Sequence, residues 1–152
     1  MYQKNKIDIL KEHENMLFEN REIIKNIAFD YVITFNTRSF MHHLTFKNSL
    51  LYEFEKRLNK KLYGYKWRTE GNKIHWVHNI EHESNNTHSH SVCKINNNIR
   101  HQKFKKQAYR IWHKLNFKLG NLNAQLYIDN FDKPTAVANY ITKDNYADFS
   151  FV

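Results

Sequence analysis

The chain has 152 residues, a length that predicts one domain. Its 24 Lys and Arg outnumber its 15 Asp and Glu, which gives a formal net charge of +9 and makes the domain basic. Its 41% hydrophobic content argues against a disordered chain, 3 Gly and 1 Pro exclude collagen-like sequence, and one cysteine, Cys93, excludes an internal disulfide. Because the sequence has neither an apolar run of about 18 residues nor a hydrophobic block near Met1, we expect a cytoplasmic protein without a membrane span or signal peptide.

The first half of the chain predicts a helix, a strand and a second helix. Apolar residues recur at helical spacing over Asn5–Ile27, and β-branched and aromatic residues fill Phe29–Phe35, which predicts a buried strand. Asn48–Leu62 has one apolar and one basic side, and Gly64 follows as a helix terminator.

The middle of the chain predicts an antiparallel hairpin. Lys73–Glu83 alternates at period two, the polar Ser84–Thr87 is suited to a loop, and His88–Ile95 is a second strand.

The remaining sequence predicts a helix over Ile99–Leu119, a strand over Gln125–Phe131 and a last helix over Ala136–Asp144. Asp132 is the expected cap of that last helix, and Pro134 fits its first turn. The order of elements predicts an α+β fold, in which helices pack on an antiparallel sheet with a central hairpin. We expect residues 1–152 to form a single domain, with residues 1–28 as an N-terminal helical extension.

Two histidines of the predicted hairpin are candidate metal ligands. His88 and His90 are two apart on a strand, so both imidazoles lie on one face. A loop of residues 84–87 would place Glu83 opposite His88 and Glu81 opposite His90. Two imidazoles and a carboxylate suit Mg²⁺ or Mn²⁺, with Glu81 as the expected carboxylate and Glu83 as the alternative. The alternatives are a polar solvent-facing strand and a rival triplet, which converges poorly because its first member points away from the other two: His75, His78 and His82.

Tyr140 and Lys143 are a second candidate pair, because residues three apart share one face of a helix. A tyrosine hydroxyl beside a metal-bound phosphate is a possible nucleophile, and a lysine can neutralise the phosphate. Tyr146 lies about 240° around the helix from Tyr140 and cannot serve the same centre. The alternative is that Tyr140 and Lys143 have only a structural role in the helix.

The excess of Lys and Arg favours a polyanionic partner, and nucleic acid is the commonest one. The alternative is a solvated, lysine-rich surface. The expected contacts to DNA are Asn36, Arg38, Lys66, Arg68, Lys103, Lys106 and Arg110.

In chain order, these motifs resemble those of HUH endonucleases, in particular single-tyrosine rolling-circle replication initiators of plasmids and phages. The matching segments, which span about Tyr31 to Asp144, are Ile33-Thr34-Phe35-Asn36, Glu81 with His88-Ser89-His90, and Ala138-Asn139-Tyr140-Ile141-Thr142-Lys143, together with Arg57-Leu58-Asn59-Lys60-Lys61-Leu62-Tyr63-Gly64. The residue between the paired histidines is usually hydrophobic in that family and is Ser89 here.

The resemblance implies an HUH nuclease-like domain that nicks and rejoins single-stranded DNA or an origin hairpin. A divalent ion on Glu81, His88 and His90 would polarise a phosphate, which Tyr140 would attack to leave a 3′-OH and a 5′-phosphotyrosine link. A host helicase is a further expected partner, in a bacterial cytoplasm. Two other functions stay open: an inactive nucleic-acid-binding module of the same fold, and a metal-dependent protein that binds or cleaves RNA.

Overall fold

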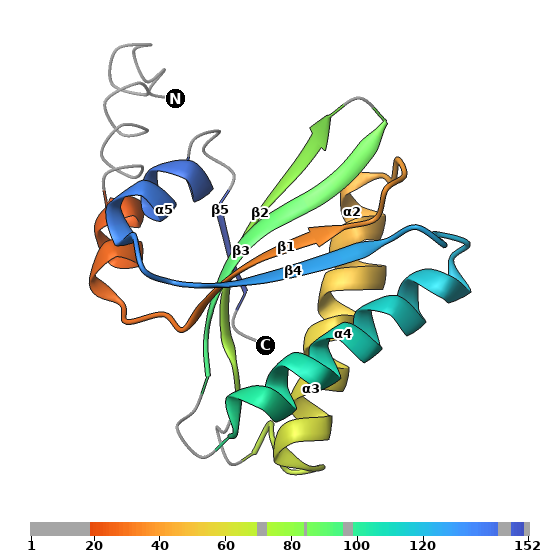
Figure 1. Cartoon of the computed structure of the whole chain (residues 1–152), viewed down its shortest axis with the longest axis horizontal. Coiled ribbons are helices and arrows are strands. Elements are labelled where there is room, and N and C mark those ends of the chain that lie inside the picture. The colour runs from red at the N-terminus through yellow and green to blue at the C-terminus, as the bar shows by residue number, and fades with distance from the viewer. Residues whose placement is uncertain (1–18, 70–72, 84, 96–98, 143–146, 151–152) are drawn as a thin grey trace, which may run out of the picture.

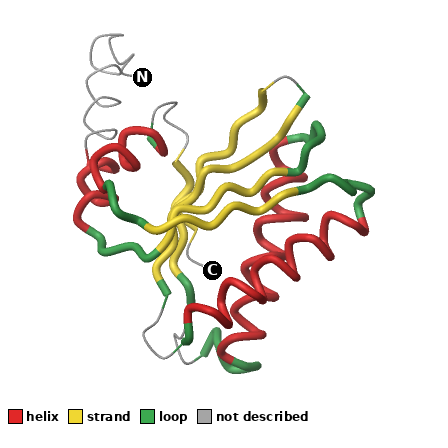
Figure 2. The backbone as a smooth tube through the Cα atoms, viewed as in Figure 1, coloured by secondary structure: helices red, strands yellow, loops and turns green. Residues whose placement is uncertain are grey.

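The computed structural model describes residues 19–69, 73–83, 85–95, 99–142 and 147–150, and confirms the predicted α+β class. A five-stranded antiparallel sheet, in the order β4-β1-β3-β2-β5, runs through the middle of the molecule, with helices on both of its faces (Figures 1 and 2). The strands are β1 (Tyr31–Asn36), β2 (His75–Glu83), β3 (Asn86–Lys94), β4 (Gln125–Asn130) and β5 (Ala147–Ser150).

The helices follow the predicted apolar periodicity. They are α2 (His43–Thr45), a π-helical segment η1 (Phe46–Tyr52), α3 (Glu53–Tyr63), α4 (His101–Lys118) and α5 (Pro134–Ile141), and residues 19–26 are also helical. The first three run on without a break, so the helix begins earlier than the sequence predicts. It ends at Gly64, whose φ of 81° favours glycine.

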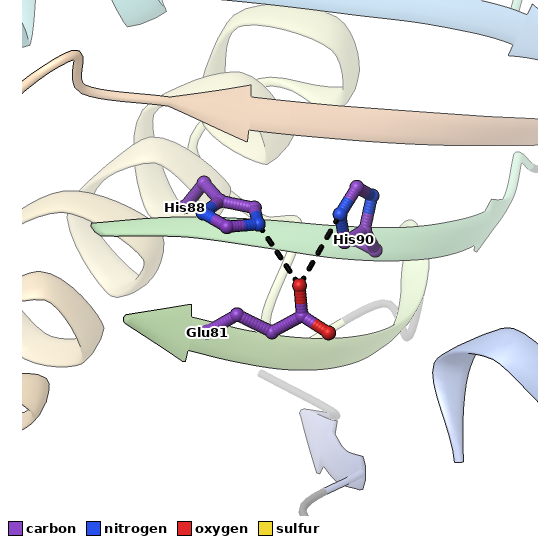
Figure 3. Close-up of side chains that lie close together, drawn as sticks. All are labelled: Glu81, His88 and His90. Carbon is purple, nitrogen blue, oxygen red and sulfur yellow. Dashed lines mark hydrogen bonds and ion pairs between the residues drawn. The ribbon is translucent and has the colours of Figure 1, made fainter. Parts of the chain in front are cut away.

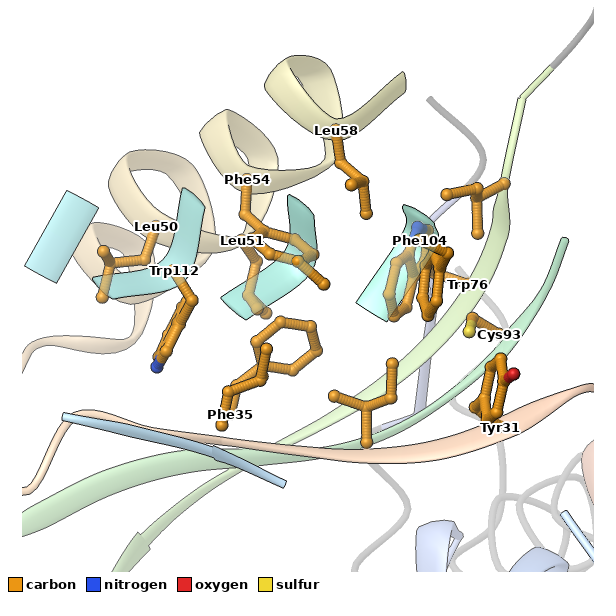
Figure 4. Close-up of a cluster of buried hydrophobic side chains, with 14 of the residues drawn as sticks. Tyr31, Phe35, Leu50, Leu51, Phe54, Leu58, Trp76, Cys93, Phe104 and Trp112 are labelled. Carbon is orange, nitrogen blue, oxygen red and sulfur yellow. The ribbon is translucent and has the colours of Figure 1, made fainter. Parts of the chain in front are cut away.

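One face of the sheet packs against η1, α3 and α4 and forms the main core (Figure 4). Alternate residues of β1 and β2 point into it, among them Phe35 and Trp76, which contact Phe54 of α3. Trp112 of α4 also contacts Phe35 and donates its indole N–H to the carbonyl of Gln125. This aromatic packing fixes the helices against the sheet and makes the hairpin a rigid base.

The opposite face of the sheet is only partly covered. Val77 and Val92, which are directly paired, pack with Ile24 of residues 19–26 and with Ala138 and Ile141 of α5. Beyond these apolar residues, the same face continues as a polar surface toward the β2–β3 turn. The candidate site lies at this boundary.

Two elements differ from the sequence prediction. β5, which pairs with β2 at the edge of the sheet, was not predicted. The last helix starts at Pro134, as expected, but its N-cap is Lys133 rather than Asp132. Residues 1–18 and 143–146, which include much of the predicted N-terminal helix and the end of the predicted last helix, lie outside the described residues.

Candidate metal centre and tyrosine

The hairpin register places Glu81 directly opposite His88, and Asn79 opposite His90. The predicted register, with Glu83 opposite His88, is wrong by two residues, because β3 already begins at Asn86. Asn85 sits in the turn with a φ of 63°, a conformation that asparagine tolerates in tight hairpin turns. A shift of two keeps every side chain on its predicted face, so Glu81 still joins the histidines.

The ligand atoms of Glu81, His88 and His90 converge on one point (Figure 3). The Oε2 atom of Glu81 lies 2.9 Å from Nε2 of His88 and 3.4 Å from Nε2 of His90. One ligand atom from each residue lies within 4.8 Å of the other two. This group can hold a metal ion, as the sequence predicts. Glu83, the alternative carboxylate, is exposed, lies opposite Asn86 and is not part of the group.

The donor set fits a divalent cation. Two imidazole nitrogens and one carboxylate oxygen are ligands for several divalent metals, and the half-buried His90 leaves one side of the group accessible. The Nδ1 atom of His88 is buried and has no hydrogen-bond partner within the described residues. The nitrogen of His88 that lies against Glu81 is Nε2, so the unpartnered Nδ1 is a separate feature of the ring.

The site is partly enclosed, since Glu81 and His88 are only 7% and 6% exposed. Neighbouring polar side chains orient the ligands. The side-chain amide of Asn79 lies 3.5 Å from Oε1 of Glu81, and the hydroxyl of Thr34 on β1 lies 3.3 Å from Nδ1 of His90. Such contacts hold ligands in position for a metal.

Tyr140 lies beside this group. Its hydroxyl is 3.0 Å from Nε2 of His90, and the two rings meet edge to face with centroids 4.7 Å apart. Burial of Ala138 and Ile141 against the sheet holds α5 in place and leaves Tyr140 at its rim, 44% exposed. Thr142 accepts a hydrogen bond from Arg21, which ties α5 to residues 19–26. Lys143 and Tyr146 lie outside the described residues.

The expected DNA-binding residues separate into two groups. Asn36 pairs with His88 across β1 and β3, so it lies on the face of the metal group. Arg38 follows it, with a φ of 56°, and donates its backbone N–H to Oδ1 of Asn36. The remaining residues lie on or just after the helices that cover the other face: Lys66 and Arg68 after α3, and Lys103, Lys106 and Arg110 on α4.

Tyr127 on β4 extends the metal-site face, although the sequence analysis does not single it out. The register aligns Tyr127 with Thr34 and then His90 in one row across three strands. Its ring is 44% exposed, and Arg38 donates a hydrogen bond to its hydroxyl at 3.1 Å. The alternation around the buried Leu126 is the sequence signal that places Tyr127 on the outer face.

The rival triplet of His75, His78 and His82 does not form a metal group. His78 points to the helical face, where it stacks on Trp76 and bonds Glu55, whereas strand alternation places His75 on the face of Glu81. Burial lowers the pKa of His75, and its neighbours Lys73 and Lys94 lower it further. Burial also lowers the pKa of His82, as does its proximity to His43.

Comparisons with known proteins add little to this geometry. No family model matches the chain, and no curated protein matches it either. One solved structure is similar, a hypothetical protein, ORF119, from Sulfolobus islandicus rod-shaped virus 1. It is 17% identical, with a TM-score of 0.41, over 94% of this chain and 98% of that one. No helix among the described residues is long and apolar enough to cross a membrane.

Proposed function

We propose that the protein is an HUH-type endonuclease that nicks and rejoins single-stranded DNA through a 5′-phosphotyrosine intermediate. The observation that carries this proposal is the 3.0 Å approach of the Tyr140 hydroxyl to Nε2 of His90, a nitrogen that also faces Glu81. A nucleophile and a metal group are thus adjacent, although they are far apart in the sequence.

Glu81, His88 and His90 would hold the divalent ion, for which we propose Mg²⁺ or Mn²⁺. When bound, the ion supplies electrophilic activation of the scissile phosphate and neutralises charge that develops on its oxygens. Asn79 and Thr34 keep the carboxylate and one imidazole oriented toward the ion.

Tyr140 attacks the phosphorus through its phenolic oxygen. The new bond joins that oxygen to phosphorus, the bond from phosphorus to the 3′-oxygen breaks, and the proton lost by the tyrosine is balanced by one gained at the 3′-oxygen. Because one phosphodiester replaces another, attack by a 3′-OH reverses the reaction and rejoins the strand. The 44% exposure of Tyr140 leaves room for a phosphate to reach it.

Single-stranded DNA is the substrate that the surroundings favour. Glu81 and His88 are buried, so a flexible strand reaches this group more easily than a rigid duplex. Exposed Tyr127, in the same row as His90, offers a ring on which an unpaired base can stack. The activity suits initiation of rolling-circle replication of a plasmid or phage in a bacterial cytoplasm, with unwinding by a host helicase.

Covalent capture tests the proposal. The protein is incubated with Mn²⁺ and a pool of labelled single-stranded DNA, and adducts are resolved on a denaturing gel. We expect an adduct with the wild-type chain and with the control Tyr127→Phe, and none with Tyr140→Phe, which removes one oxygen and keeps the ring. An adduct that persists in Tyr140→Phe would assign the nucleophile to another residue.

A chain that binds the DNA pool but forms no adduct with any sequence, with or without Mn²⁺, would contradict the endonuclease and favour the inactive binding module. The same assay with RNA of matching sequence tests whether the protein acts on DNA or on RNA.

A further inference from the structure

A basic hollow lies on the outer side of the helical layer, between α3 and α4. Its volume is about 220 Å³, and both helices contribute cations to its walls. We name this hollow the α3–α4 groove, and it is lined by Arg57, Lys61, Gln107, Arg110, Ile111 and Lys114.

Two further hollows of about 310 and 470 Å³ continue the groove along α3, and both share Arg57 with it. They add cations, among them Lys60 and Arg68, and the ring of Tyr65, which is 86% exposed. The Nζ atom of Lys60 lies 4.5 Å from the centroid of that ring. The basic surface is therefore continuous over the length of a helix rather than confined to one pocket.

The charge of the groove is mostly uncompensated. Nε of Arg57 lies 3.3 Å from Oε2 of Glu53, and the same carboxylate also pairs with Lys56. Lys61, Arg110 and Lys114 are exposed, and the described part of the chain places no carboxylate in an ion pair with them. Cations on two facing walls produce a positive potential that attracts a polyanion.

The groove and the metal group lie on opposite sides of the sheet. The buried sides of α3 and α4 pack on the face that carries Phe35 and Trp76, whereas Glu81, His88 and His90 point to the other face. A phosphate bound between Lys61 and Lys114 is therefore separated from Tyr140 by the helical layer and the sheet.

We infer that the α3–α4 groove is a second DNA-binding surface, which holds the phosphodiester backbone independently of metal and of Tyr140. Exposed cations without buried donors suit a run of phosphates better than one small anion, and they select charge rather than sequence. Single-stranded and duplex DNA both present this backbone. The inference goes beyond the proposed nicking activity, and the choice of DNA as the polyanion rests on that proposed function.

The test is DNA binding, without metal, by the triple variant Lys61→Gln/Arg110→Gln/Lys114→Gln. Affinity is measured by fluorescence anisotropy at several salt concentrations, with duplex and single-stranded oligonucleotides in separate arms. Each lost phosphate contact should lower the slope of log K against log salt by about 0.9 for duplex or 0.7 for a single strand. We expect the triple variant to bind one or both forms roughly 100-fold more weakly at 0.1 M salt.

The matched control removes the same charge from residues outside α3 and α4, with Lys25→Gln/Lys94→Gln/Lys133→Gln. We expect this control to keep most of the affinity and slope of the wild-type chain. Equal losses in the two triple variants would reduce the effect to net charge and overturn the inference, as would unchanged binding of both DNA forms by the groove variant.

Lysine protection gives a second measurement that does not depend on how the variants fold. DNA added to the wild-type chain should shield Lys61 and Lys114 from acetylation, read by mass spectrometry, and leave the exposed Lys94 of β3 reactive. Lysines that react equally with and without DNA would overturn the inference.

DNA binding at the groove can be distinguished from DNA binding at the proposed nicking site. Tyr140→Phe in EDTA should retain the duplex affinity of the wild-type chain, whether or not any adduct ever forms. Loss of duplex binding in Tyr140→Phe would place that DNA at the tyrosine instead of the groove.

Discussion

Two histidine–carboxylate clusters lie on opposite faces of the same hairpin, and they differ in what their imidazoles contact. On the helical face, His78 bonds Ser91 through Nδ1 and Glu55 through Nε2, both at 2.6 Å. On the other face, Nε2 of His88 and Nε2 of His90 lie 2.9 Å and 3.4 Å from the same oxygen of Glu81. Both nitrogens of His78 are used within its own cluster, whereas the ligand atoms of the second cluster converge on a position that a metal ion can occupy.

The cluster on the helical face also accounts for the serine between the two histidines of the metal group. The hydroxyl of Ser89 lies 3.0 Å from that of Ser91. Ser91 in turn contacts His78, so the serine joins a buried polar chain that begins at Glu55. A hydrophobic residue at position 89 would remove the last member of this chain.

The largest expected effect concerns the nicking activity that we propose for the group of Glu81, His88 and His90. His90→Ala removes one ligand and the contact to Tyr140, so nicking should fall by about 10⁴-fold, which equals roughly 5.5 kcal/mol. Binding of single-stranded DNA should fall little, because phosphate contacts carry most of the affinity. Rates and affinities measured on the same variant check this, and a loss of binding as severe as the loss of nicking would make His90 structural.

The reverse pattern is expected on the helical face. His78→Ala leaves the buried carboxylate of Glu55 without its imidazole partner, and it should cost about 3–5 kcal/mol in the free energy of unfolding. His90→Ala should cost about 1 kcal/mol or less, since Glu81 keeps His88 at 2.9 Å. Urea unfolding of both variants, without metal, makes the comparison, and similar losses would remove the distinction between the clusters.

A smaller effect is expected at Tyr127. Replacement by Ala should weaken binding of single-stranded DNA by about 1–3 kcal/mol if a base stacks on the ring. Tyr127→Phe keeps the ring and should bind nearly as the wild-type chain does, despite losing the hydrogen bond from Arg38. Fluorescence anisotropy distinguishes the two, and equal weakening by both variants would assign the role to the hydroxyl.

The smallest effect is expected at Glu53, a half-buried carboxylate that pairs with Lys56 and serves as a reference. A hydrogen bond from Lys56 lowers the pKa of Glu53, so the charged form of Glu53 stabilises the folded state. Because that pKa is depressed on folding, the contribution is present at neutral pH and is lost as the pH falls through the acidic range.

We expect Glu53→Gln to cost about 0.5 kcal/mol or less at pH 7 and nothing at the acidic end. Unfolding curves recorded at several pH values would show this convergence. A pH-independent cost would contradict an ionic origin.

Sequence periodicity predicted the faces of the hairpin and the described elements other than β5, because the alternation of apolar residues is local. It did not predict the register of the hairpin, since the register depends on a turn at Asn85 whose positive φ is not visible in the residue pattern. The contact of Tyr140 with His90 depends on how α5 packs on Val77 and Val92, which is a tertiary property.

The cluster of His78 and Glu55 was missed for a different reason. His78 lies between Trp76 and Ile80 on the apolar side of the strand, so its burial could have been inferred from the sequence. Its partner could not, because Glu55 is on a helix whose other charged residues are mostly on the solvent side, and nothing local marks it as buried.

The most direct test of the account is a titration of the wild-type chain with Mn²⁺, with the free ion followed by electron paramagnetic resonance. The account predicts one bound ion per chain, with affinity at least tenfold lower in His88→Ala and Glu81→Gln. The control His82→Ala alters an exposed neighbour of Glu81 and should bind as the wild-type chain does. No binding by the wild-type chain, or equal binding by His88→Ala, would contradict the assignment of this group as a metal centre.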